Sequence, residues 1–179
     1  SFFHGAENGS MGFLGYSNIL GIDKYFGRNE YNNDNDFDGY WGIWDEPFLQ
    51  FMKEKLDEEQ EPFFSTVFTI SSHEPYIIPE KYKDTFSEGD IIMHKCVKYT
   101  DFALRRFFDE AKKEHWYNNT LFIMVADHAH KIYYPEYRKA LNFNTIPILF
   151  HHPDGRYNGI NNLLAQQIDI YPTIVDMIG

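Results

Sequence analysis

The sequence predicts an α/β fold in which a mostly parallel sheet is flanked by helices. Short runs of apolar, β-branched and aromatic residues alternate with longer amphipathic runs, as strands and helices do in such folds. Several of the apolar runs end directly in histidine or aspartate, which is typical of strands whose carboxyl ends line a site. With 179 residues, 43% of them hydrophobic and 18% aromatic, the chain can form a buried core.

The first half of the chain predicts a loop-rich segment, one helix and one strand. Residues 1–45 are rich in glycine, asparagine and aromatic residues and have no clear periodicity, so we expect loops that shape a site. Glu46 and Pro47 are typical of a helix start, and the apolar stripe of that helix is Phe48, Leu49, Met52 and Leu56. Residues 63–70 predict a strand, and residues 71–75 the loop after it.

The second half predicts the longest helix, two strands and a final helix. The amphipathic pattern of residues 91–114 indicates the long helix. Residues 121–126 predict a buried strand, and residues 145–150 a second strand, which Pro147 places at a sheet edge. The last helix is expected to start near Asp169, with Pro172 in its first turn.

Charge and composition limit the classes of function. Lys and Arg number 16 against 27 Asp and Glu, a net charge of −11, which argues against nucleic-acid binding. An anionic ester is still an acceptable substrate, because a bound cation can supply local positive charge. The lone Cys96 excludes an intrachain disulfide and is expected to be a small buried side chain. No apolar stretch reaches the ~18 residues of a membrane span.

Three predicted strands lead into candidate site residues. One strand end precedes His4, a second leads through two serines to His73, and the third is followed directly by Asp127 and His128. Because the carboxyl ends of parallel strands share one rim, we expect these residues to lie near one another. The alternatives are an ordinary turn at Asp127-His128 and capping or core positions for the single histidines.

The residue types suggest a metal site beside an anion site. Asp127 and His128 offer oxygen and nitrogen ligands that suit Mn²⁺ or Zn²⁺, with Mg²⁺ and Ca²⁺ less favoured. His73 and His4 would hydrogen-bond the anionic group or protonate a leaving oxygen. For His130, a solvent-facing position is favoured over a role in the site.

Other patterns carry less information. The carboxylates of Asp34, Asp36, Asp38 and Asp45 nearly match the spacing of an EF-hand loop, but no helix precedes them, so an acidic turn is preferred. His151-His152 leads into a Pro-Asp-Gly turn, and the glycosylation sequon at Asn118 is a common chance match. There is no G-x-S-x-G elbow, P-loop or cysteine cluster.

Five segments resemble the lipoteichoic acid synthase-like sulfatases of the alkaline phosphatase superfamily. They occur in the family's order and read YWGIWDEPF at 40–48, PFFSTVFTISSHEPY at 62–76, VADH at 125–128, IPILFHHP at 146–153 and QIDIYPTIVDMIG at 167–179. The resemblance implies an alkaline-phosphatase-like fold and chemistry on sulfate or phosphate esters with a divalent metal. Asp127 and His128 match two metal ligands of that family, and His73 and His4 match histidines of its substrate pocket.

The resemblance also implies what this chain lacks. The family's Thr or Ser nucleophile and its other metal ligands correspond to sequence upstream of Ser1, so residues 1–179 are expected to form one partial domain without a catalytic nucleophile, truncated at both ends. The family's Trp-x-Arg, which grips glycerol phosphate, is replaced by Met11 and Phe13 at the matching positions. Glycerol-phosphate polymerisation is therefore not expected.

Two functions follow from this reading. The first is an enzyme of the bacterial cell envelope, anchored in the cytoplasmic membrane with its catalytic domain outside, that acts on sulfate or phosphate esters attached to a lipid or a glycan. This fragment alone would be inactive and soluble. The second is a catalytically inactive domain of the same fold with a binding or structural role. An upstream acidic metal ligand and a Thr or Ser nucleophile would distinguish the first from the second.

Overall fold

The computed structural model describes residues 1–130, 132–140 and 142–178. Its central strand, β1 (Phe2–His4), lies between β2 (Tyr25–Phe26) and β3 (Thr66–Phe68) and is parallel to both. The register places His4 beside Phe68, so β1 and β3 end at the same edge of the sheet. The predicted parallel sheet is confirmed for these three strands.

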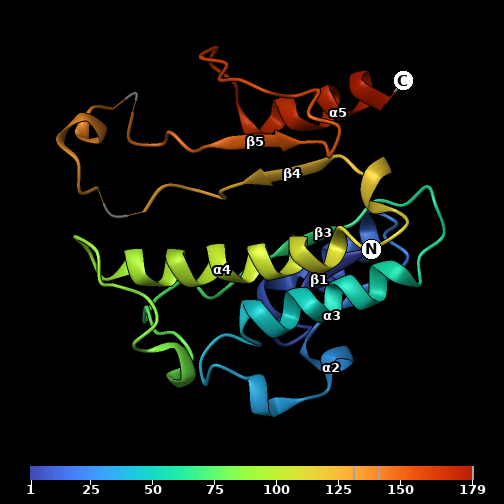
Figure 1. The fold of residues 1–179 in the computed structure, drawn as a ribbon, viewed down its shortest axis with the longest axis horizontal. Helices are drawn as coiled ribbons and strands as arrows, with labels where there is room; N and C mark the ends of the chain where they lie inside the picture. The colour runs from blue at the N-terminus through green and yellow to red at the C-terminus, as the bar shows by residue number, and fades with distance from the viewer. Residues whose placement is uncertain (131, 141, 179) are drawn as a thin grey trace.

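Two long helices cover one face of this sheet. In Figure 1, α3 (Asp45–Asp57) and α4 (Met93–Ala111) lie on the viewer's side of β1 and β3. Both helices were predicted, to within two residues at their starts. The stripe of α3 packs on β1 and α4, which removes a large apolar area from water. The core includes Phe3, Ile43, Phe48, Leu49, Met52, Leu56, Ala103, Phe107, Ala111, Trp116 and Tyr117.

The shorter helices occur mainly in connections. They are η1 (Ser10–Gly12), α1 (Phe13–Ile19), α2 (Arg28–Tyr31), η2 (Asp34–Asp36), η3 (Glu80–Tyr82), η4 (Tyr117–Asn119), η5 (Pro135–Arg138) and η6 (Gln167–Asp169). Residues 1–45 were expected to be mainly loops. They contain loops around β1 and β2, but also the short helices η1, α1, α2 and η2, which the composition did not predict. Cys96 is fully buried in α4, also as predicted.

The last two strands form a separate sheet. β4 (Phe122–Val125) pairs with β5 (Ile148–His151) in antiparallel orientation, with Ile123 opposite Phe150. In Figure 1 this pair lies above α4. Within the described residues neither strand hydrogen-bonds to β1 or β3, so the expectation that all three site-bearing strands share one sheet rim is wrong. Apolar runs predict that a strand exists, but its partner depends on contacts distant in sequence.

The C-terminal segment has an exposed apolar surface. The final helix, α5 (Ile170–Ile178), follows η6 and contains Pro172 in its first turn, as predicted. Gly179, the last residue of the segment that resembles the sulfatases, lies outside the described residues. Several apolar side chains around α5 are exposed, among them Ile160, Leu163, Leu164, Ile168 and Tyr171. No helix in the described part of the chain is long and apolar enough to cross a membrane.

Candidate functional site

His4 lies at the end of β1, inside the protein. Its side chain is only 2% exposed, and its ring packs edge-on against those of Phe13 and Phe68, with centroid distances of 4.9 and 5.5 Å. Burial lowers the pKa of His4 to about 4, so the imidazole is neutral at pH 7. Among the described residues its Nδ1 has no hydrogen-bond partner. In the structure the His4 side chain packs in the protein interior. The predicted contact between His4 and an anionic ester stays a prediction.

A buried carboxylate fixes the loop that follows β3. Asp45, the first residue of α3, accepts hydrogen bonds from the backbone N–H groups of Ile70 and Ser71 at 2.9 and 3.2 Å. Its other oxygen accepts from the hydroxyl of Thr100 at 2.8 Å, and its own N–H donates to Oγ of Ser71. Burial raises the pKa of the Asp45 carboxyl, and these hydrogen bonds oppose that shift. Asp45 therefore sets the path of the backbone that leads to His73.

His73 is exposed and lies against an aromatic ring. The centroids of the Trp41 and His73 rings are 4.3 Å apart, and the indole N–H of Trp41 donates to the carbonyl of Glu74 at 2.5 Å. The N–H of Tyr76 donates back to the carbonyl of His73 at 3.0 Å. His73 is thus held in a tight turn and presents an edge of its imidazole at the surface, where the sequence predicted a substrate contact.

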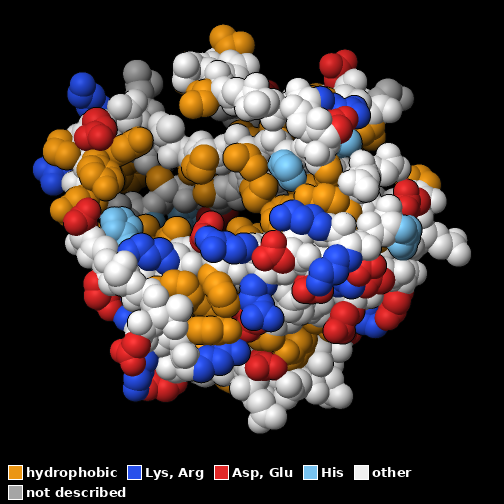
Figure 2. Space-filling model, in the orientation of Figure 1, with side chains coloured by type: hydrophobic (Ala, Val, Ile, Leu, Met, Phe, Trp, Pro, Cys, Tyr) orange, Lys and Arg blue, Asp and Glu red, His pale blue; other side chains and the backbone are white. Residues whose placement is uncertain are grey.

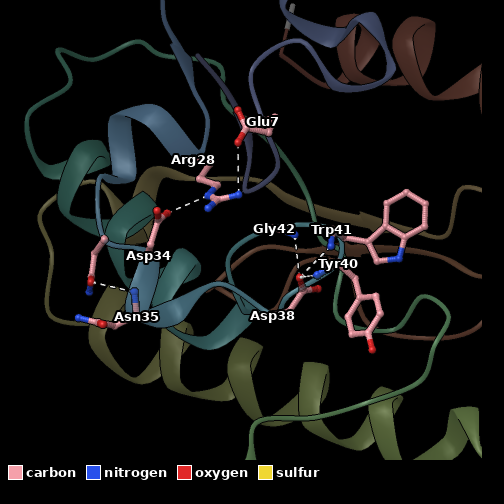
Figure 3. A network of polar contacts seen from close by, with 9 residues as sticks. Glu7, Arg28, Asp34, Asn35, Asp38, Tyr40, Trp41 and Gly42 are labelled. Carbon is pink, nitrogen blue, oxygen red and sulfur yellow. Dashed lines mark hydrogen bonds and ion pairs between the residues drawn. The ribbon is translucent and has the colours of Figure 1, made fainter.

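The loop that carries Trp41 is organised by one aspartate. Figure 3 shows the Asp38 carboxylate, whose Oδ1 accepts the backbone N–H groups of Tyr40, Trp41 and Gly42 at 2.8, 2.8 and 3.0 Å. Gly42 also lies so close to the backbone of Gly5 that a Cβ atom would overlap its carbonyl group. This contact ties the loop to the residue that follows His4.

The acidic segment is a structural turn and not a calcium loop. Asp34 pairs with Arg28 at 2.8 Å, and Asp36 accepts from the hydroxyl of Tyr31 at 2.6 Å. Asp38 and Asp45 bind backbone amides, as described above. The expectation that no helix precedes the segment is wrong, because the short helix α2 ends at Tyr31. The four carboxylates nevertheless face different partners, which favours an acidic turn that leads into α3. In Figure 3, Arg28 lies between Glu7 and Asp34.

Asp127 and His128 follow β4 and face one another at the surface. Nε2 of His128 is 3.3 Å from Oδ2 of Asp127, and Nδ1 of His128 is 2.9 Å from the carbonyl oxygen of Ala129. In the tautomer whose Nδ1–H donates a hydrogen bond to that carbonyl, Nε2 keeps its lone pair, on the side of the ring that faces the Asp127 carboxylate. Gln167 fixes the backbone here, because its side-chain amide donates to the carbonyls of Ala126 and Asp127 at 2.9 Å each.

The carboxylate of Asp127 and the imidazole of His128 fit part of a metal site. Two ligands bonded at about 2.1 Å to one four- to six-coordinate metal are roughly 3.0–3.4 Å apart, so a separation of 3.3 Å suits a shared cation. No group of three or more His, Cys, Asp or Glu residues in the described ranges could hold a metal. The pair can therefore supply two ligands, and the remainder would come from elsewhere in a larger protein.

His130 links the loops that follow β3 and β4. It is exposed, as predicted, but its Nε2 is hydrogen-bonded to the hydroxyl of Tyr76, so it also contacts the loop that contains His73. Its ring centroid is 6.5 Å from that of His128. Sequence reasoning missed Tyr76, Gln167 and the anchoring role of Asp45, because no local pattern marks a partner that is 25 to 55 residues away.

A second Asp–His pair has a different environment. His152 Nδ1 lies 2.9 Å from Asp154, but Arg156 also binds Asp154. The hydrogen bonds from Arg156 hold the pKa of the Asp154 carboxyl well below its usual range. A guanidinium already satisfies this carboxylate, so the predicted turn is the better description of this segment.

Comparison with known proteins places this arrangement in a family. The sulfatase family model matches residues 3–179, nearly the whole chain. The chain belongs to the sulfatase family. This confirms the relationship that the five segments indicated.

Several sulfatase-family relatives are similar along most of this chain. Lipoteichoic acid synthase 1 of Bacillus subtilis (strain 168) is 26% identical over 178 residues, which cover 89% of this chain and 28% of that protein. Lipoteichoic acid synthase of Staphylococcus aureus (strain USA300) is 25% identical over 176 residues, 89% of this chain and 27% of that protein. The chain thus spans somewhat more than a quarter of the length of these curated relatives.

Solved structures share the fold. A protein of the alkaline phosphatase superfamily from Vibrio parahaemolyticus matches 99% of this chain with a TM-score of 0.79 and 31% identity. The lipoteichoic acid synthase LtaP from Listeria monocytogenes matches 88% with a TM-score of 0.71 and 19% identity. This chain covers 44% of each of those chains. The predicted sulfatase-like α/β fold is confirmed.

Proposed function

We propose that the whole protein is a metal-dependent sulfatase or phosphotransferase that acts on sulfate or phosphate esters at the bacterial cell envelope. The observation that carries this proposal is the 3.3 Å approach of Asp127 Oδ2 and His128 Nε2 at the end of β4. Membership of the sulfatase family supports the class of reaction. The similarity to lipoteichoic acid synthases supports a place at the cell envelope. A membrane anchor and an extracytoplasmic catalytic domain belong to the proposal as what the family resemblance implies.

The residues of this chain would bind and orient the ester. A divalent cation, Mn²⁺ or Zn²⁺ in preference to Mg²⁺ or Ca²⁺, would polarise an ester oxygen and stabilise developing negative charge. Asp127 and His128 would supply two of its ligands, and Gln167 would hold their backbone in place. His73 would donate a hydrogen bond to the anion from the neighbouring loop. The nucleophilic hydroxyl would come from a part of the protein outside these 179 residues.

The substrate differs from glycerol phosphate in this proposal. Met11 and Phe13 stand where the resembling family has its Trp-x-Arg, and neither offers a charge to a phosphate. Met11 is exposed, and the ring of Phe13 packs on Phe2 and His4. We therefore propose that the substrate is an ester carried by a larger lipid or glycan.

Turnover by the whole protein tests this function. The protein is stripped of metal with a chelator, reloaded separately with Mn²⁺, Zn²⁺, Mg²⁺ or Ca²⁺, and assayed on an aryl sulfate and on an aryl phosphodiester. We expect release of the aryl alcohol from one ester class, with Mn²⁺ or Zn²⁺ giving the higher rates. Bound metal without turnover of either ester would instead favour the inactive module. No metal dependence at all would contradict the proposal.

A further inference from the structure

The Gln167 side chain connects the C-terminal segment to the end of β4. Figure 1 shows the β4–β5 pair between α4 and the segment that contains α5. From that segment, Nε2 of Gln167 donates to the carbonyl oxygens of Ala126 and Asp127, each at 2.9 Å. The two carbonyls lie 41 and 40 residues earlier in the chain, so this contact belongs to the tertiary structure and not to a local turn.

Two successive carbonyls can reach one nitrogen only where the strand has ended. In an extended strand the backbone carbonyls point alternately to opposite sides. β4 ends at Val125 and the chain bends at Asp127, which brings the carbonyls of Ala126 and Asp127 to one side. A primary amide has two N–H hydrogens, one for each of these carbonyls. Gln167 therefore stabilises the bend.

The bend in turn orients the side chains of Asp127 and His128. The backbone N–H of His128 donates to Oδ1 of Asp127 at 2.9 Å, which leaves Oδ2 of that carboxylate facing Nε2 of His128. On the other side of the imidazole, Nδ1 lies 2.9 Å from the carbonyl oxygen of Ala129. Backbone groups of residues 127–129 thus set the direction of both metal-binding atoms, and the path of that backbone follows from the bend that Gln167 holds.

A neutral amide suits a position beside a cation. Lysine or arginine could also donate to two carbonyls, but either would bring a positive charge close to the bound metal and oppose its binding. A carboxylate would face the two carbonyl oxygens without a hydrogen to donate. Glutamine provides two donors without a charge. Groups that orient metal ligands without binding the metal typically change metal affinity by about 10- to 100-fold when they are removed.

We propose that Gln167 is a positioning residue that sets the metal affinity of the Asp127–His128 pair. This inference rests on the proposed function, which it deepens by assigning a role to a side chain that binds the backbone instead of the ion. The bend holds Oδ2 of Asp127 and Nε2 of His128 at 3.3 Å before the metal arrives, so less conformational entropy is lost on binding. Without the two donors, the carboxylate and the imidazole would be free to turn apart.

Titration of Mn²⁺ into the metal-free whole protein tests this role. Electron paramagnetic resonance of the free ion gives the Kd, with no ester present. Gln167→Met keeps the approximate length of the side chain and removes both donors, so its Kd for Mn²⁺ should rise about tenfold or more. Gln167→Ala should weaken binding to a similar extent. The zero-field splitting of the bound ion, which reports the symmetry of its ligands, should change in both variants.

Thr173→Val is the matched control. It removes the hydrogen bond from the Thr173 hydroxyl to the carbonyl of Asp169, at 2.6 Å, which lies in the same segment and does not involve β4. Its Kd for Mn²⁺ should stay within about twofold of the wild-type value. The positioning role is overturned if Gln167→Met binds Mn²⁺ as tightly as the wild type, or if Thr173→Val weakens binding as much as Gln167→Met.

A double variant, Asp127→Ala with His128→Ala, separates the two proposals. If it loses Mn²⁺ affinity while Gln167→Met retains it, the metal site stands and only the positioning role is wrong. If the double variant binds Mn²⁺ as tightly as the wild type, the metal site of the proposed function is wrong, and the positioning role is wrong with it.

Discussion

The hydroxyl of Tyr76 is hydrogen-bonded to Nε2 of His130, and this contact joins the loops that follow β3 and β4. Burial raises the pKa of Tyr76, so its hydroxyl keeps its proton at neutral pH. The two sheets share no hydrogen-bonded strand pair in the described ranges, yet the loops that follow β3 and β4 meet here. Figure 2 shows histidines and hydrophobic side chains along the seam between α4 and the β4–β5 pair, with a hollow near the start of α4.

Metal binding should depend on the pair at the end of β4. Asp127→Ala combined with His128→Ala removes both converging donors, so we expect the whole protein to lose at least half of its bound metal, as measured by elemental analysis. Asp154→Ala combined with His152→Ala is the matched control, since that pair is already satisfied by Arg156. Equal metal content in both double variants would show that the ligand assignment is wrong.

Acid should destabilise the protein through His4. Its pKa is lowered to about 4 in the folded chain, against 6.5 in the unfolded chain, so the unfolded state binds the proton first. Its contribution to stability is complete above pH 6.5 and is lost as the pH falls toward 4. Between pH 7 and 4.5 the wild type should lose about 2–3 kcal/mol relative to His4→Gln. Denaturant unfolding at several pH values measures this difference, and parallel curves for the two proteins would refute it.

The Asp45 carboxylate should be important for stability. Asp45→Ala leaves the buried N–H groups of Ile70 and Ser71 without acceptors, at a cost of about 1–3 kcal/mol for each. Asp45→Asn keeps one acceptor oxygen and should cost roughly 1 kcal/mol. Chemical denaturation gives both values, and hydrogen exchange should show faster exchange at residues 70–73 in the alanine variant. Similar stabilities for the two variants would argue against an anchoring carboxylate.

Close packing at Gly42 should also be important for the stability of the fold. An alanine Cβ would overlap the backbone of Gly5, so Gly42→Ala should destabilise the protein by about 2–3 kcal/mol. Gly15, in α1, has open space at its Cβ position, so Gly15→Ala should be neutral or stabilise by up to about 1 kcal/mol. Thermal unfolding of both variants measures the contrast. A tolerated Gly42→Ala would mean that the loop does not depend on this contact.

The sequence was most informative where the physical signal is local. The stripe of α3 predicted its buried face, and an apolar run followed by Asp127 and His128 predicted that β4 exists and has a polar end. The expectation that this strand is buried is wrong, since β4 is only partly buried in the described residues. These features depend on residue periods and on neighbouring residues, which a single sequence contains. The family resemblance added the order of the segments and was confirmed by the match over residues 3–179.

Long-range partners could not be predicted in the same way. Nothing near β4 indicates that it pairs with β5 in antiparallel orientation, because that choice depends on the path of the intervening chain. The burial of His4 follows from the rings of Phe13 and Phe68, which come from different elements. Tyr76 and His130 likewise meet only because two loops approach one another.

The Asp38 turn fixes the shape of a loop without depending on the side chains that the loop displays. The carboxylate binds backbone amides, which every residue except proline possesses, so the path of residues 38–42 is independent of which side chains occupy positions 40 and 41. Selection can therefore exchange both rings without refolding the surrounding strands. Relatives that keep the aspartate and the glycine but differ at these two positions would be expected to share the backbone path of this loop.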